Sequence, residues 1–256
     1  MARQKLGQHF LTNGTILRRI ASAAGLGCKG LGGKALVVEI GPGKGALTQH
    51  LLAAFERVTV VELDPVLAQH VRERWQDEPR LEVLERNALD VRWPAFGPGV
   101  LAGNLPYYVA TAIISHYVND PGLLTPGVFL IQKEVAERIT ATPGHREYGY
   151  LSVECQLLAK AEFVFSVPPG AFQPPPKVDS ALLRLTPVPP PAGIDVKHFL
   201  GFVSSCFHQK RKTLRNNLAG RYSREILDLR PEIGQRAEQL SVQQLLDLYS
   251  ALNGPQ

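Results

Sequence analysis

The chain has 256 residues, of which 45% are hydrophobic and 20% are charged, and its net charge is +5. This length is enough for one large domain and a smaller one, and the composition is that of a globular protein. No apolar run approaches the roughly 18 residues that span a bilayer, and the N-terminus lacks the apolar stretch of a signal peptide, so we expect no membrane partner. Three well-separated cysteines without a CxxC pair argue against a zinc site or a disulfide framework and favour a reducing cytoplasm.

The charge is distributed unevenly along the chain. Residues 1–34 carry six bases and no acid, residues 35–190 carry 13 bases and 17 acids, and residues 191–256 carry nine bases and six acids. Seven bases and no acid lie between Asp195 and Glu225. Two basic ends on an acidic body suggest a polyanionic partner that the ends bind, although ordinary solvated helices would give the same pattern.

Strand and helix patterns alternate through the first part of the chain. Residues 34–40 predict a short apolar strand, residues 45–55 an amphipathic helix and residues 57–63 a β-branched strand. A helix, two strands, a helix and another strand are then predicted at residues 65–75, 80–86, 99–105, 110–118 and 127–132. This alternation predicts βαβ units and an α/β fold with a doubly wound, mostly parallel sheet.

The later part of the chain changes in character. Residues 162–172 and 180–188 are typical of a hairpin-type pair at one edge of the sheet, and the prolines of residues 186–194 indicate a stiff linker. Helical patterns without a strand pattern follow at residues 196–219 and 241–252. We therefore predict an α/β domain over residues 1–190 and a small all-helical domain over residues 191–256.

A glycine-rich loop, EIGPGKG at residues 39–45, ends the first predicted strand. Gly41 and Gly43 let the backbone turn sharply and approach a ligand closely. The GxGxG spacing differs from the GxGxxG spacing that places a pyrophosphate at a helix N-terminus. A tight strand-to-helix turn can also need glycine for steric reasons alone.

Polar residues end the next two strands at the same edge of the predicted sheet. Glu62 and Asp64 end the second strand, where a carboxylate can accept hydrogen bonds from both hydroxyls of a ribose. Asn87 ends the third strand, where an amide can contact the rim of an adenine. Each could be an ordinary exposed residue, but three at one edge favour an adenosine-type ligand. An adenosine without a pyrophosphate in such a sheet indicates S-adenosylmethionine.

With these features the chain resembles a class I, Rossmann-like methyltransferase. The resemblance implies a seven-stranded, mostly parallel sheet in which Glu39 closes the first strand and Glu62 binds ribose. It also implies S-adenosyl-L-methionine as the cofactor, S-adenosylhomocysteine as the product and no metal.

The predicted strand at residues 99–105 ends within the stretch Asn104-Leu105-Pro106-Tyr107. This NLPY stretch resembles the D/N/S-P-P-aromatic box of methyltransferases that act on exocyclic amines, in the variant of the ribosomal RNA adenine dimethylase family. Adenine N6 is a poor nucleophile because its lone pair is delocalised into the ring. An asparagine oxygen and a main-chain carbonyl, held rigid by proline, can accept its two N–H bonds, while Tyr107 stacks on an extruded base. A helix cap with buried tyrosines is the structural alternative.

The resemblance to this family covers essentially the whole chain. GQHFL at residues 7–11 resembles the family's N-terminal motif, which usually has asparagine where His9 stands, and implies that His9 and Leu11 line the cofactor pocket. Phe172 corresponds to an aromatic residue that faces the target base. Asn87, placed in the cofactor site, stands where many relatives have aspartate, which keeps a hydrogen-bond acceptor but loses a charge.

The C-terminal stretch FHQKRKTLRNNL, at residues 207–218, resembles the signature of the subfamily that modifies the small ribosomal subunit. The resemblance implies transfer of four methyl groups to two adjacent adenosines in a hairpin loop near the 3′ end of 16S rRNA, within a partly assembled 30S subunit. It implies a cytoplasmic monomer of ribosome biogenesis. We expect its C-terminal domain to bind RNA through a broad positive helical face formed by Lys210, Arg211, Lys212 and Arg215.

Two alternatives stay open from the sequence. A DNA adenine methylase or a large-subunit rRNA methylase would share the catalytic half of the chain. A non-catalytic nucleic-acid-binding factor could retain the fold, although the intact NLPY stretch and glycine loop argue against lost activity. Methylation assays on isolated RNA, DNA and small subunits distinguish these readings.

Overall fold

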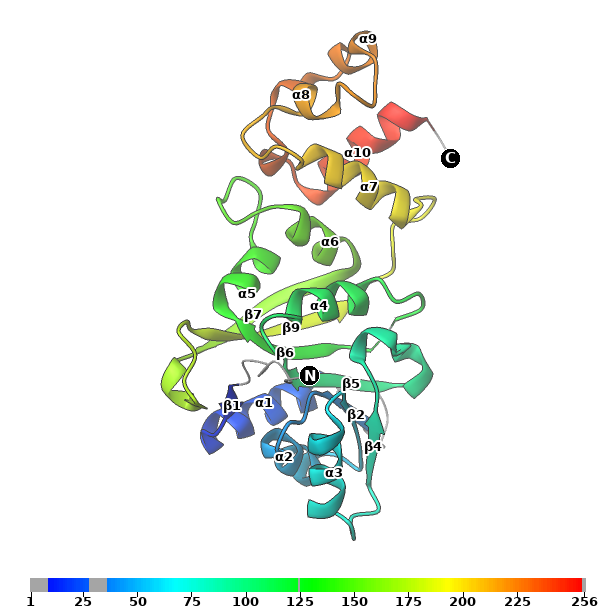
Figure 1. Ribbon diagram of the computed structural model, residues 1–256. Coiled ribbons are helices and arrows are strands. Elements are labelled where there is room, and N and C mark those ends of the chain that lie inside the picture. The colour runs from blue at the N-terminus through cyan, green and yellow to red at the C-terminus, as the bar shows by residue number, and fades with distance from the viewer. Residues whose placement is uncertain (1–8, 28–35, 124, 255–256) are drawn as a thin grey trace, which may run out of the picture. The chain divides into compact units, whose positions relative to one another are not determined.

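The computed structural model describes residues 9–27, 36–123 and 125–254 (Figure 1). A seven-stranded sheet with the order β4-β3-β2-β5-β6-β9-β7 forms its centre. The strands are β2 (Leu36–Ile40), β3 (Arg57–Glu62), β4 (Leu81–Glu85), β5 (Gly99–Asn104), β6 (Gly127–Gln132), β7 (Ala159–Val167) and β9 (Ser180–Pro187). Strands β4, β3, β2, β5 and β6 pair in parallel, whereas β9 pairs antiparallel with β6. The predicted mostly parallel, seven-stranded sheet is confirmed.

Five α-helices precede, connect or follow the parallel strands. They are α1 (Gly14–Gly27), α2 (Ala46–Ala54), α3 (Pro65–Arg74), α4 (Ala110–Val118) and α5 (Lys133–Thr140). Short 3-10 helices lie at Ala88–Asp90, Trp93–Phe96, Pro169–Ala171, Pro231–Gly234 and Ala237–Gln239. In the described part of the chain, none of the helices combines the length and the hydropathy needed to cross a membrane.

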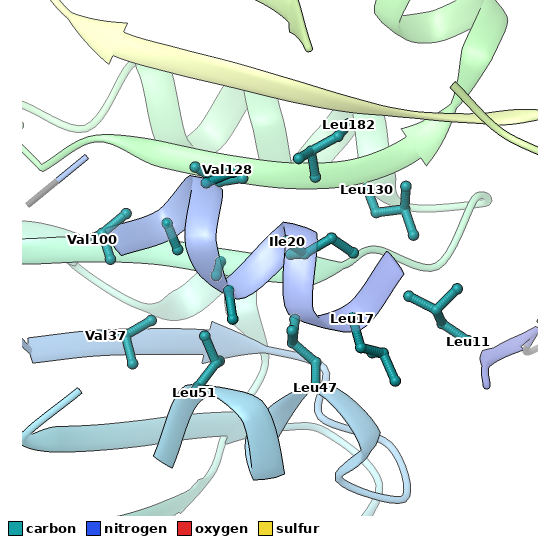
Figure 2. Packing of buried hydrophobic residues seen from close by; sticks show 14 of the residues in the cluster. Leu11, Leu17, Ile20, Val37, Leu47, Leu51, Val100, Val128, Leu130 and Leu182 are labelled. Carbon is teal, nitrogen blue, oxygen red and sulfur yellow. The ribbon is translucent and has the colours of Figure 1, made fainter. Parts of the chain in front are cut away.

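Helix α1, which no sequence pattern predicted, packs against α2 and against strands β5 and β6 of the sheet. Figure 2 shows Leu17 and Ile20 of this helix among side chains of β2, β5, β6 and α2. Ile20 is completely buried, and so is Leu51 of α2. Burying such a side chain stabilises the fold by roughly 1.5–3 kcal/mol. The helix thereby fixes the segment that precedes it, which includes His9 and Leu11.

That preceding segment forms a second, two-stranded sheet. Strand β1 (Phe10–Leu11) pairs antiparallel with β8 (Phe172–Gln173), with Leu11 opposite Phe172. The backbone N–H of Thr12 extends the pairing by donating to the Ala171 carbonyl at 2.9 Å. Residues far apart in the chain are thus held together beside the sheet.

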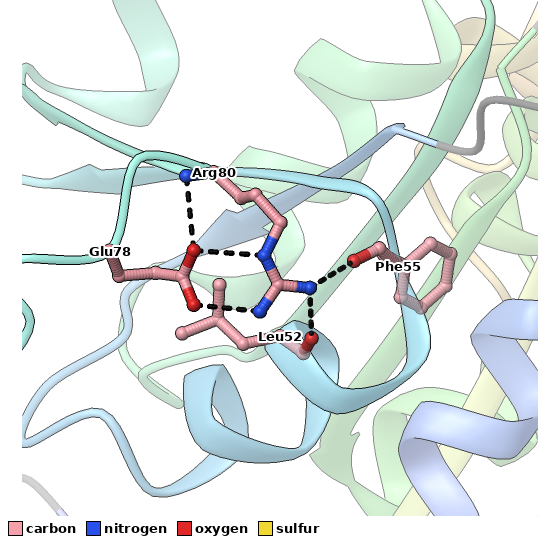
Figure 3. Close-up of polar contacts among 4 residues, drawn as sticks. All are labelled: Leu52, Phe55, Glu78 and Arg80. Atoms are coloured by element: carbon pink, nitrogen blue, oxygen red, sulfur yellow. Dashed lines mark hydrogen bonds and ion pairs between the residues drawn. The ribbon is translucent and has the colours of Figure 1, made fainter.

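Arg80 ties the end of α2 to the start of β4 (Figure 3). Its Nη1 donates to the carbonyl oxygens of Leu52 at 3.0 Å and Phe55 at 3.5 Å, where the helix has unpaired acceptors. Its Nε and Nη2 donate to the two carboxylate oxygens of Glu78 at 2.8 and 2.7 Å. These hydrogen bonds lower the pKa of Glu78. The contacts fix α2, the helix that follows the glycine loop.

The chain divides into two compact units. The first comprises residues 1–136 and 160–187, and the second comprises residues 137–159 and 188–256. The helices of the second unit include α6 (Tyr150–Leu158), α7 (Val196–Cys206), α8 (Leu214–Leu218), α9 (Arg224–Asp228) and α10 (Val242–Asn253). The division predicted at residue 190 assigned residues 137–159 to the first domain. They group with the second unit because α6 packs against α7 and α10.

The helical pattern of residues 196–219 forms two helices, and the predicted helical face around residues 210–215 is interrupted. Helix α7 ends at Cys206 and α8 begins only at Leu214. Asn217 stabilises the break, because its Nδ2 donates to the Cys206 carbonyl at 2.7 Å and its Oδ1 accepts from the Gln209 N–H at 3.1 Å. Residues 210–212 therefore lie in a turn and not on a helical face.

Candidate active site

A pocket lies at the carboxyl ends of the parallel strands, where α/β sheets commonly bind their ligands. Its wall combines the segment at β1, the glycine loop, the end of β3 and the NLPY stretch. Most of the residues predicted for the site line it: His9, Leu11, Glu39, Gly41, Gly43, Glu62, Asn104, Leu105, Pro106 and Tyr107. Phe10, Thr12 and Lys44 also line the pocket, and their only sequence signal is their position beside predicted residues.

The glycine loop follows a path that excludes side chains. Gly43 and Gly45 have φ angles of +56° and +78°, in the left-handed region that favours glycine. A Cβ on Gly45 would lie 2.4 Å from the Trp75 ring, and one on Gly43 would lie 3.0 Å from the Phe10 ring. The loop therefore passes between two aromatic rings, and its backbone forms one wall of the pocket.

Glu62 holds this loop in place from the end of β3. Its two carboxylate oxygens accept from the backbone N–H groups of Gly43 at 3.2 Å and Asp64 at 2.9 Å. The residue is 7% exposed, and this burial raises the pKa of its carboxyl. Two backbone donors fix the direction of the carboxylate on the pocket wall, where its remaining lone pairs can accept from ligand hydroxyls.

Asn104 ends β5 with its amide in a defined orientation. Its Nδ2 donates to the His9 carbonyl at 3.2 Å, so the NH₂ group faces the β1 segment. Among the described residues no donor is recorded for its Oδ1. The side chain therefore presents an acceptor oxygen in the pocket, and its direction depends on the placement of His9.

The residues after Asn104 provide a second acceptor of this kind. The N–H of Leu105 donates to the Leu130 carbonyl at 3.0 Å, and the Pro106 carbonyl accepts from the Val109 N–H at 3.0 Å. No hydrogen bond to the Leu105 carbonyl is recorded within the described chain. Since proline restricts the backbone around the bond that follows, the Leu105 carbonyl has a fixed direction, and both residues line the pocket.

Tyr107 and His9 form the aromatic side of the pocket. Their ring centres lie 5.7 Å apart at an angle of 35°. The Tyr107 hydroxyl forms a hydrogen bond of 2.6 Å with the Ser180 hydroxyl. Burial raises the pKa of Tyr107. His9 Nδ1 lies 2.8 Å from the Pro174 carbonyl, which can only accept, so Nδ1 carries the proton.

Comparison with known proteins shows the family of this chain. The family model of the ribosomal RNA adenine dimethylases matches residues 1–253. The chain belongs to the ribosomal RNA adenine dimethylase family. The "Ribosomal RNA small subunit methyltransferase A" of Acidobacterium capsulatum is 42% identical over 97% of this chain and 90% of its own. The protein of the same name from Alcanivorax borkumensis is 40% identical over 99% of this chain and 91% of its own length.

Solved structures show the same fold. A dimethyladenosine transferase from Plasmodium falciparum is 26% identical, with a TM-score of 0.79 over 94% of this chain and 96% of that one. The 23S rRNA methyltransferase ErmE is 28% identical, with a TM-score of 0.74 over 95% of this chain and 99% of that one. The protein is thus an rRNA adenine dimethyltransferase with a methyltransferase fold.

Two predicted site residues of this dimethylase do not line the pocket. Asn87 caps the 3-10 helix after β4, where its Oδ1 accepts from the Leu89 N–H at 3.1 Å. Phe172 is 4% exposed and belongs to the hydrophobic core. In this structure its ring has little surface for a stacked base, which differs from the predicted contact with the target.

The predicted cations of the second unit fall into two groups. Arg215 pairs with Asp228 at 2.8 Å, and Lys210 pairs with Glu238 at 3.8 Å and donates to the Arg146 carbonyl. Arg211 and Lys212 are exposed, and the described part of the dimethylase contains no ion pair for either. Of the N-terminal bases, Arg3, Lys5, Lys29 and Lys34 lie outside the described residues.

Glu39 gives the dimethylase a pH-dependent stability. The side chain is 1% exposed, and burial raises its pKa from 4.5 to about 8, despite a 2.6 Å hydrogen bond from Thr48. Because the raised pKa keeps Glu39 protonated in the folded state, its contribution to stability is complete below pH 4.5 and is lost as the pH rises to about 8. Each unit of pKa change corresponds to about 1.4 kcal/mol.

We therefore expect Glu39→Gln, which is neutral at every pH, to unfold at a higher temperature than wild type at pH 8.5. Near pH 5 the two proteins should have similar melting temperatures, because both side chains are then neutral. Thermal unfolding without cofactor, across this pH range, measures the difference. A difference that does not change with pH would show that Glu39 ionises normally in the folded protein.

Proposed function

We propose that the protein uses S-adenosyl-L-methionine to convert two adjacent adenosines of 16S rRNA into N6,N6-dimethyladenosine. The target is a hairpin loop near the 3′ end of the RNA, within a partly assembled 30S subunit. The observation that carries the chemistry is the orientation of Asn104, whose NH₂ is bound to the His9 carbonyl and whose oxygen faces the pocket.

The acceptor pair accounts for activation of the amine. Asn104 Oδ1 and the Leu105 carbonyl accept the two N–H bonds of adenine N6. This arrangement favours a pyramidal nitrogen, whose lone pair then points into the pocket. Rigid placement of this kind can accelerate a displacement by several orders of magnitude without a covalent intermediate.

The residues of the pocket fit the cofactor. Glu62 accepts from ribose hydroxyls, and the backbone of Gly41 allows close approach, since a Cβ there would meet nothing within 4 Å. Bound S-adenosylmethionine supplies an electrophilic methyl group on a sulfonium. A contact between Asn87 and the adenine rim requires the ligand to extend beyond the residues that line the pocket, and the Asn87 NH₂ is the group available for it, since its oxygen accepts from the Leu89 N–H.

Aromatic residues hold the extruded base. Tyr107 is half-buried and lines the pocket, so its ring can stack on the target adenine. The core position of Phe172 suits it to supporting the β1 segment, through its pairing with Leu11. A contact between Phe172 and the base requires this pairing to shift when RNA binds.

The relatives favour the small subunit over the large subunit as the substrate. The small-subunit methyltransferases are 38–42% identical to this chain, whereas the 23S enzyme ErmE is 28% identical. A ribosomal substrate also implies action in the cytoplasm, by a monomer that binds one subunit.

Binding to the subunit should depend on Arg211 and Lys212. We expect Arg211→Ala with Lys212→Ala to weaken binding and to lower the salt slope by about two units, one for each lost phosphate contact. Arg215→Ala is the matched control, since Arg215 is already paired with Asp228. Binding measured over a range of salt concentrations tests this.

Affinity for S-adenosylmethionine should not change in these variants, because residues of the first unit line its pocket. If the double variant binds the subunit normally at every salt concentration, Arg211 and Lys212 do not contact RNA.

Transfer of labelled methyl groups tests the substrate. Small subunits that lack the modification should accept label, whereas free 16S rRNA, large subunits and adenine-containing DNA should accept much less. Preferred labelling of large subunits or DNA would contradict the proposed substrate. Subunit binding without any transfer would instead indicate a non-catalytic factor.

A further inference from the structure

Lys44 is a charged residue of the pocket wall to which no role has been assigned. It lies in the glycine loop, and two buried acids, Glu39 and Glu62, line the same pocket. Among the described residues, however, its ammonium group has no recorded ion pair. It lies instead 5.1 Å from the centre of the Phe10 ring. The ammonium group is therefore held at the pocket wall by an aromatic ring and not by an acid.

A hydrogen bond from Arg74 holds the backbone of Lys44 in place. Arg74 Nη1 donates to the Lys44 carbonyl at 2.9 Å, and Arg74 Nη2 donates to Gln49 at 3.0 Å. The guanidinium lies 4.5 Å from the centre of the Trp75 ring, which in turn packs against Gly45. The backbone of Lys44 is therefore held rigidly, while its side chain is exposed.

Phe10 completes this support on the pocket side. The Phe10 ring can lie close to the loop because Gly43 has no side chain. A Cβ on Gly43 would lie only 3.0 Å from this ring. Both Phe10 and Lys44 line the pocket. The ammonium group is thus positioned by two features of the local geometry: the absence of a Cβ on Gly43 and the Phe10 ring beside it.

The other side-chain donors of the wall already have partners in the protein. These hydrogen bonds are His9 Nδ1 to the Pro174 carbonyl, Thr12 Oγ1 to the Ala171 carbonyl, Asn104 Nδ2 to the His9 carbonyl and Tyr107 Oη with Ser180 Oγ. Among the described wall residues, Lys44 Nζ is the side-chain donor group for which no hydrogen bond is recorded. Its charge makes an anionic ligand group its best partner.

We propose that Lys44 binds the carboxylate of the methionine portion of S-adenosylmethionine. The inference rests on the proposed cofactor, which carries one carboxylate together with a sulfonium and an ammonium group. The Glu62 carboxylate on the same wall repels the carboxylate of the ligand, which therefore needs a cation beside it. Lys44 is the residue that supplies this cation.

Calorimetric titration of Lys44→Met tests the proposal, because methionine keeps an apolar stem over Phe10 and removes the charge. The ligands are S-adenosylmethionine, S-adenosylhomocysteine and decarboxylated S-adenosylmethionine, which lacks only the carboxylate. We expect the variant to bind the first two about 5- to 10-fold more weakly at low salt, as for a partly exposed charged hydrogen bond. Its affinity for the decarboxylated ligand should equal that of wild type.

Two further variants complete the test. Lys44→Arg should restore most of the affinity, because it restores the charge. Lys160→Met removes an exposed lysine that pairs with Glu162 at 3.4 Å, away from the pocket, and should bind all three ligands as wild type does.

Unchanged affinity of Lys44→Met for every ligand, or equal weakening for all three, would overturn the assignment. Failure of wild type to bind S-adenosylmethionine would instead contradict the proposed function, whatever the behaviour of Lys44.

Discussion

Asn104→Ala should lose methyl transfer by ~100-fold or more, because the target amine loses one of its two rigid acceptors. The Asn104 side chain makes one recorded hydrogen bond, to the His9 carbonyl at 3.2 Å, so its removal leaves the glycine loop and Glu62 in place. Affinity for S-adenosylmethionine and for the small subunit should therefore change little. Single-turnover methylation, together with calorimetry for the cofactor, separates the two effects.

Asn104→Asp should not restore the rate. Aspartate keeps an acceptor oxygen but has no N–H for the His9 carbonyl, so its orientation is lost. Gln69→Ala is a control for loss of an amide, since Gln69 is exposed on α3 and its recorded side-chain hydrogen bond is to Glu73. A rate for Asn104→Ala above about half that of wild type would remove Asn104 from the chemistry, given the ~100-fold cost of lost positioning.

Glu62→Ala should weaken binding of S-adenosylmethionine by ~1–3 kcal/mol, the range for charge-assisted hydrogen bonds that are no longer made. The loss has two sources. The ribose hydroxyls lose their acceptor, and the Gly43 N–H loses the carboxylate that holds the loop. Calorimetry on the folded variant measures the combined effect of both losses on cofactor affinity.

Glu62→Gln removes the negative charge of the side chain but keeps its shape. Both carboxylate oxygens accept a backbone N–H, so an amide would direct its NH₂ against one of these donors and should also weaken binding. Glu82→Ala removes an exposed acid of β4 that bonds to Thr59 and should have no effect on the cofactor. Normal cofactor affinity in both Glu62 variants would show that this carboxylate does not bind the ligand.

The sequence predicted the central strands β2, β5 and β6 well because these strands are buried on both faces. Such strands appear as short, continuous apolar runs, and residues 127–132 were predicted with the bounds that β6 has. Helix α4 was likewise predicted with its observed bounds, 110–118. The acids and amides that end the strands could be recognised because the ends of parallel strands meet at one edge.

Other features depend on contacts between distant residues. The β1–β8 pairing is two residues long and joins positions 10–11 to 172–173, so neither segment has a strand pattern of its own. The break after α7 depends on Asn217, a single side chain from the next helix. Local periodicity cannot reveal either of them.

Within the site, the sequence identified residue types but not their hydrogen bonds. It predicted Asn104 as an acceptor, and the structure adds the His9 carbonyl that orients it. It gave no role to Lys44, because a lysine in a glycine loop is usually solvated. It placed Phe172 at the base, whereas burial of its side chain is a property of the folded core.

Mass spectrometry of 16S rRNA tests the central proposal most directly. Small subunits lacking the modification are incubated with the protein and isotopically labelled S-adenosylmethionine, and the 3′-terminal fragment of the RNA is then digested and sequenced. The acceptor pair at Asn104 and Leu105 predicts labelled N6,N6-dimethyladenosine at two adjacent positions of one hairpin loop, and its absence with Asn104→Ala. Label on a different base, on another atom of adenine, or in undiminished amount with Asn104→Ala would contradict this account.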